Sequence, residues 1–138
     1  MTADRTPAHA EAAAGRWARL TLAEQMAHVG SEVGRAMRAH ASGPVARFEP
    51  ALHRALELFD LTAADARWRG PRRREILRAR EEFCRLFFDS AVSPRSGAGL
   101  ERYFLAFARA ARRATRAARW AGDPGRGAPG QEDGRRFR

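Results

Sequence analysis

The chain has 138 residues, enough for one domain, and its 26 basic residues are all Arg, which gives a formal net charge of +10. Residues 1–66 carry seven Arg against eight acids, whereas residues 67–138 carry nineteen Arg against eight acids. This asymmetry indicates a polyanionic partner, most plausibly nucleic acid, but identifies no reaction. The single cysteine, Cys84, excludes an internal disulfide, and no apolar run reaches the ~18 residues of a membrane span. We therefore expect a cytoplasmic protein without a membrane partner.

The first strong helix signal begins at Thr21, because Thr21 and Glu24 have the spacing of a capping box. An apolar stripe follows at four- and three-residue steps, formed by Leu22, Met26, Val29, Val33 and Met37. Gly30 and Gly34 continue a ridge of small residues beside this stripe. Glycine lowers helix propensity, so we expect another helix to pack closely there, from this chain, a partner protein or a second copy.

Two further helices are expected at residues 45 or 50 to 61 and at residues 72–89, with Pro71 in the first turn of the latter. The predicted inward residues are Phe48, Leu52, Ala55, Leu56 and Phe59 in the first, and Ile76, Ala79 or Arg80, Phe83, Leu86 and Phe87 in the second. Residues 62–70 are expected to connect the two helices.

A fourth helix is expected at residues 100–120, after a loop at 90–99 that contains Pro and Gly. Its predicted core stripe comprises Leu100, Tyr103, Phe104, Phe107, Ala111, Ala114 and Ala118. Four amphipathic helices with short connections predict an all-α fold, a single four-helix bundle-like domain over residues 19–120. Residues 1–18 are expected to form a flexible arm, with Trp17 as a possible anchor, and residues 121–138 a disordered tail.

Two segments concentrate the basic residues that we predict to bind nucleic acid. The predicted residues are Arg69, Arg72, Arg73, Arg74, Arg109, Arg112, Arg113, Arg116 and Arg119. Guanidinium groups bind phosphates through bidentate hydrogen bonds, and the neighbouring Trp68 and Trp120 could stack on unpaired bases. The alternative is a solvated face, or one whose arginines pair with acids of the first two helices or of a protein partner.

Two other patterns could carry chemistry. Glu24, His28 and Glu32 recur at four-residue spacing, as do Glu49, His53 and Glu57, but both trios lie mostly opposite the apolar stripes, so we expect ion pairs and no metal. Arg35–His40 and Arg47–His53 match the R-x4-6-H motif of the HEPN ribonucleases, which are also small helical proteins. That resemblance implies Arg35 and His40 as candidate catalytic residues of a ribonuclease subunit. The chain contains no Gly-rich phosphate loop, so we expect no cofactor.

Several segments resemble a family of small, uncharacterised bacterial helical proteins. The residues that carry this resemblance are 23–35, 54–62, 67–70, 80–81 and 103–104. The resemblance implies a soluble, bacterial, all-α protein and transfers no activity. It also implies that Asp60, Asp65, Trp68, Arg69 and Gly70 form a structured elbow.

The sequence therefore favours a non-enzymatic module that binds nucleic-acid backbones, RNA before DNA. The alternatives are a protein–protein adaptor and a HEPN-like ribonuclease subunit.

Overall fold

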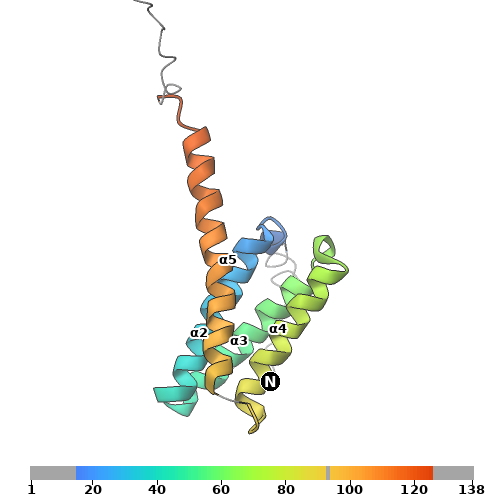
Figure 1. The fold of residues 1–138 in the computed structure, drawn as a ribbon, viewed down its shortest axis with the longest axis vertical. Coiled ribbons are helices and arrows are strands. Elements are labelled where there is room, and N and C mark those ends of the chain that lie inside the picture. The colour runs from blue at the N-terminus through green and yellow to red at the C-terminus, as the bar shows by residue number, and fades with distance from the viewer. Residues whose placement is uncertain (1–14, 93, 126–138) are drawn as a thin grey trace, which may run out of the picture.

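The computed structural model describes residues 15–92 and 94–125 and confirms the all-α fold, with no strand among those residues. The main helices are α2 (Leu22–Ser42), α3 (Val45–Ala64), α4 (Pro71–Phe88) and α5 (Pro94–Ala121), and a short 3-10 helix, η1 (Ala66–Trp68), precedes α4 (Figure 1). Helix α2 packs against α3 and α5, and α4 packs against the same two helices. The four helices therefore surround one core, as a bundle does.

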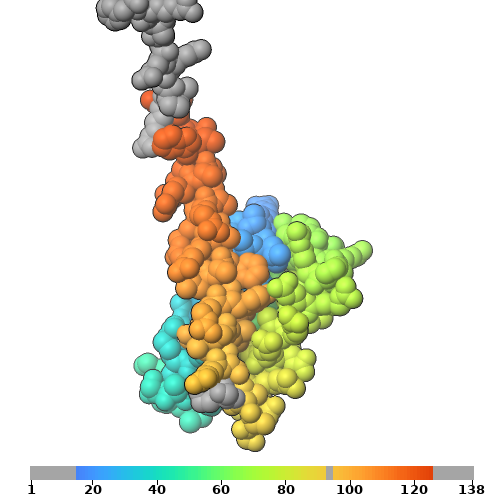
Figure 2. Space-filling model, viewed as in Figure 1, coloured from blue at the N-terminus to red at the C-terminus, as the bar shows by residue number. Residues whose placement is uncertain are grey.

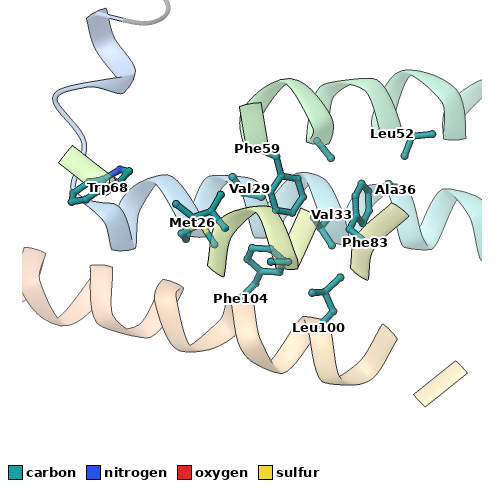
Figure 3. Close-up of a cluster of buried hydrophobic side chains, with 13 residues drawn as sticks. Met26, Val29, Val33, Ala36, Leu52, Phe59, Trp68, Phe83, Leu100 and Phe104 are labelled. Atoms are coloured by element: carbon teal, nitrogen blue, oxygen red, sulfur yellow. The ribbon is translucent and has the colours of Figure 1, made fainter. Parts of the chain in front are cut away.

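The core is built mainly from the predicted stripes (Figure 3). Its buried residues are Met26, Val29, Val33, Ala36, Leu52, Ala55, Phe59, Trp68, Ile76, Ala79, Phe83, Leu100 and Phe104. Aromatic rings join the helices, since the ring of Phe59 lies 5.8 Å from that of Phe83 and 5.9 Å from that of Phe104. Offset and edge-on ring pairs at these separations stabilise a core beyond the area they bury.

The start of α2 has the predicted capping box. The amide of Glu24 donates to Thr21 Oγ1 at 3.2 Å, and the amide of Thr21 donates to Glu24 Oε1 at 3.1 Å. These bonds satisfy two of the donors that a helix start leaves unpaired. Helix α3 begins at Val45, the earlier of the two predicted starts, and contains Pro50.

The glycine ridge of α2 meets α5 of the same chain. A Cβ atom at Gly30 would lie 2.6 Å from Phe104 Cβ, so the two helices approach more closely there than any other residue permits. At Gly34 the added atom would meet only the Arg38 guanidinium, at 3.1 Å. The expected close helix crossing is therefore present at Gly30. The prediction that this ridge meets a protein partner or a second copy is wrong for Gly30, because Phe104 occupies it.

Helix α5 is longer than predicted at its start. It begins at Pro94, so the prediction of a loop through residue 99 is wrong. Proline suits the first turn of a helix, and Gly97 lies inside the helix where α2 comes close, since a Cβ there would be 2.9 Å from Met37 Cε.

The second half of α5 leaves the bundle. Figures 1 and 2 show it projecting beyond the ends of the other helices. Leu100 and Phe104 are buried and Ala111 is half-buried, but Ala114 and Ala118 are exposed. The predicted core stripe is therefore wrong for its last two members, because no other described helix reaches far enough to cover them.

A buried polar network joins the start of the chain to the α3–α4 connection. Gln25 Nε2 donates to the Trp17 carbonyl and to Asp65 Oδ2, and Gln25 Oε1 accepts from Trp68 Nε1, at 2.8 to 2.9 Å. Trp17 Nε1 donates to Thr62 Oγ1 at 3.1 Å. These bonds fix the elbow that the family resemblance implies. They also dock Trp17 onto the bundle, as the sequence predicts, whereas most of the predicted arm and tail, residues 1–14 and 126–138, lies outside the described residues.

Candidate nucleic-acid interface

The projecting half of α5 carries a dense array of arginines. Its members are Arg109, Arg112, Arg113, Arg116 and Arg119, all exposed, and residues 103–120 contain no acid. At 100° per residue these five side chains fall within about 120° of the helix circumference, and they span about 15 Å of its length. The array is therefore one continuous basic face, which we call the α5 arginine face.

The α5 arginine face makes no ion pair with the described part of the chain: none of its guanidinium groups lies within 4.0 Å of a carboxylate there. Arginines of the bundle behave differently. Arg35 and Arg54 lie 2.8 and 3.3 Å from Glu32, and Arg80 lies 3.0 Å from Asp60. Pairing with the acids of the first two helices, the alternative interpretation of the basic surface, thus accounts for these bundle arginines but not for the α5 arginine face.

Glu32 departs from the outward position that the sequence predicts. Its side chain is buried between α2 and α3, where Arg35 and Arg54 neutralise its charge. A buried carboxylate needs such partners, because leaving water without them is costly. The predicted role in ion pairing is therefore confirmed, although the site is not on the open surface.

A second group of arginines lies at the start of α4. Arg69, Arg72 and Arg74 are exposed and Arg73 is half-buried, and the first turn of α4 contains no acid and no side-chain cap. Gly70, with φ of 86°, turns the chain into this helix, a conformation that other residues adopt only with strain. The helix dipole adds positive potential at the same point.

The two tryptophans beside these arginines differ in exposure. Trp68 is 8% exposed, donates to Gln25, and has the guanidinium carbons of Arg67 and Arg72 at 4.5 and 5.6 Å from its ring centroid. It is therefore a core residue of the elbow, and base stacking on it gains no support. Trp120 is 62% exposed beside Arg119.

The two groups of arginines lie at the same end of the bundle. Helix α4 begins at the end from which α5 projects, and the space-filling view shows the first described residues, in blue, between them (Figure 2). The structure thus gathers the predicted binding residues at one end but separates them by the docked N-terminal segment.

A groove runs between the α5 arginine face and the start of α2. Its volume is about 390 Å³, and its lining includes Arg112, Arg116 and Arg119 from α5 and Glu24 and His28 from α2. The sequence does not predict that residues of α2 line this surface, because their proximity to α5 depends on how the helices cross.

The candidate catalytic pair has separate surroundings. Arg35 donates to Glu32 at 2.8 Å, whereas the ring of His40 packs against Phe48 and Phe87, with centroids 4.9 Å apart in each case. Arg35 lines a hollow together with His53 and Arg54 of α3, whereas neither His40 nor Arg47 lines it. The hollow therefore takes only one residue from each of the two predicted R-x4-6-H matches. These contacts lend no support to a HEPN-like site, which stays a prediction.

Within the described residues, no three or more His, Cys, Asp or Glu side chains are grouped so that they could hold a metal ion, and no helix is both long and apolar enough to cross a membrane. Comparison of the chain with protein-family models, curated proteins and solved structures finds no match. The resemblance to small bacterial helical proteins therefore stays a prediction.

Proposed function

We propose that this protein is a non-enzymatic module that binds the phosphate backbone of nucleic acid, RNA before DNA, through the α5 arginine face. The observation that carries the proposal is that five exposed arginines project from the bundle with no carboxylate partner among the described residues. Five cations at this density repel one another, and a polyanion relieves that repulsion while releasing its own counterions.

The arginines at the start of α4 would form a second contact surface at the same end of the bundle. Arg72, Arg73 and Arg74 stand in the first helical turn, where the helix dipole favours acids and disfavours cations. Arginines at this position lower the stability of the fold. Such a departure from the usual preference for acids in the first turn is expected where the residues serve binding. Backbone contacts of this kind carry little sequence specificity.

The preference for RNA rests on Trp120. The residue is 62% exposed and lies next to Arg119, and a surface tryptophan beside a cation is a residue type on which unpaired bases stack. Single-stranded nucleic acid presents unpaired bases, and most RNA targets are recognised in single-stranded regions.

We also propose that the protein is located in the cytoplasm. Its single cysteine supports this location, because a protein of a reducing compartment needs no internal disulfide.

A salt titration tests the proposal. Binding of a fluorescein-labelled single-stranded RNA and of a DNA duplex is followed by fluorescence anisotropy in the full chain from 50 to about 300 mM salt. For five phosphate contacts the slope of log affinity against log salt should be about −3.5 on the single strand.

A flat salt dependence, or no binding at the lowest salt, would contradict the proposal. It would point to an acidic protein as the partner of the arginines, the adaptor alternative. If RNA does bind, a competition assay tests the adaptor alternative. An acidic peptide that displaces the bound RNA no better than a neutral peptide of equal length would exclude that alternative.

A further inference from the structure

The groove between α2 and α5 differs from the rest of the α5 arginine face because it has two walls. Arg112, Arg116 and Arg119 form one wall, and His28 with Ala27 forms part of the other. A phosphate on the open face meets guanidinium groups from one side only. A phosphate in the groove can be contacted from both sides and loses more of its water, so each hydrogen bond there is stronger.

The α2 wall is held rigidly by the buried polar network. The ring of His28 lies 5.7 Å from that of Trp17, and Trp17 is anchored by its bond to Thr62 on α3. The α5 wall is a continuous helix that Phe104 and Gly30 fix against α2. Both walls are thus positioned before any ligand binds, which reduces the entropy cost of binding.

The charge of the groove is net positive despite one acid. Glu24 faces three arginines across the groove, and its Oε1 already accepts the amide of Thr21 in the capping box. No arginine of the groove reaches a carboxylate of the described chain within 4.0 Å. The cations are therefore available to an incoming anion.

The size of the groove limits what can enter. A volume of about 390 Å³ is near the lower end of the range for small-molecule sites, so it suits one nucleotide rather than a stack of base pairs. A single strand is flexible enough to lower one phosphate into it, whereas a duplex holds its phosphates on the outside of a stiff rod.

We infer that the groove between α2 and α5 binds one phosphodiester of a single strand, held by Arg112, Arg116 and Arg119 on one side and His28 on the other. This inference rests on the proposed function, and it identifies the groove as the place where the bound strand is held most firmly. The rest of the strand then runs along the outer part of the α5 arginine face, towards Trp120.

The test uses a pair of variants that change charge equally. T115E places an acid in the groove, whereas A117E places the same acid two residues along the same exposed helix but about 160° away from Thr115. Binding of a 3′-labelled 12-nucleotide oligouridine to the full chain should weaken at least tenfold more in T115E than in A117E, because a charge-assisted hydrogen bond is lost only in the groove.

A second pair tests the same site without new bulk. E24Q keeps the capping box, since Gln can replace Glu there, and removes the acid from the groove. E49Q removes an exposed acid from the start of α3, outside the groove. We expect E24Q to bind the oligouridine several-fold more tightly than E49Q does.

If the two variants of each pair bind the oligouridine equally well and the wild type still binds RNA, the inference that the groove binds a phosphodiester is wrong. The proposed function would then still hold. A wild type that does not bind would overturn the proposed function itself. A DNA duplex that distinguishes T115E from A117E as strongly as the oligouridine does would overturn the assignment to single strands.

Discussion

Asp65 illustrates how single residues hold this small fold together. Its carboxylate accepts from Arg67 at 2.8 Å and from Gln25 at 2.9 Å, and Arg67 also donates to the Leu20 carbonyl at 2.7 Å. One carboxylate therefore ties α2 to the α3–α4 connection and, through Arg67, to the segment before α2. The hydrogen bond from Arg67, more than that from Gln25, keeps the pKa of Asp65 well below its usual range despite partial burial.

This lowered pKa predicts an acid-sensitive fold. Because the folded state holds Asp65 ionised more strongly than the unfolded state does, its contribution to stability is present above the ordinary value of 3.8 and is lost as the pH falls below it. In urea titrations between pH 6 and 2.5, the stability gap between the wild type and D65N should narrow below pH 4.

D60N is the matched control for this effect, since Asp60 also pairs with an arginine but is 63% exposed. Its stability gap from the wild type should change much less across the same pH range. A D65N gap that is constant from pH 6 to 2.5 would show that Asp65 is not held in its ionised form.

At the scale of the elements, the crossing of α2 and α5 depends on one glycine. G30A should destabilise the protein by about 1–3 kcal/mol, because the new methyl group would overlap Phe104, and the higher helix propensity of Ala recovers only part of that. G34A should be neutral or stabilising by up to about 1 kcal/mol, since the mobile end of Arg38 can move away.

Chemical denaturation of the two glycine variants measures this difference directly. Equal stabilities for G30A and G34A would mean that α5 does not approach α2 at Gly30, and the docking of α5 would have to be revised.

The start of α4 predicts a conflict between stability and binding. R74E should stabilise the protein by about 0.3–1 kcal/mol, because an acid in the first turn complements the helix dipole, and should weaken RNA binding. R78E changes the charge equally but lies one turn further along, where the dipole effect has faded.

Thermal melts and anisotropy titrations of both α4 variants provide the measurement. An R74E protein that melts below R78E would indicate that the first-turn arginine stabilises the fold, and the argument for a binding role at α4 would fail.

For the whole molecule, the sequence predicts the helices and most of the core but not where a helix loses its neighbours. Apolar periodicity and the capping box at Thr21 are local signals, and the structure confirms both. Ala114 continues the same periodicity, yet it is exposed, because burial depends on whether another helix reaches it. The sequence predicts a loop at Gly97, because no local pattern shows that Met37 packs against it.

The residues proposed to bind nucleic acid also divide into those that the sequence predicts and those that it does not. Charge density along the chain is enough to single out the arginines of the α5 arginine face, because residues 102–122 contain no acid. The burial of Trp68 and the place of His28 opposite Arg112 follow from contacts between residues more than 40 positions apart, which no local pattern encodes.

The most direct test of the account compares two triple variants of equal charge. R109Q/R112Q/R116Q removes three members of the α5 arginine face, and R38Q/R47Q/R102Q removes three exposed arginines elsewhere. In the salt series with single-stranded RNA, the first variant should lose about two units of slope (0.7 for each of three contacts) and the second should keep nearly the wild-type slope. Equal losses of slope in the two variants would contradict the account, because binding would then follow net charge and not the projecting helix.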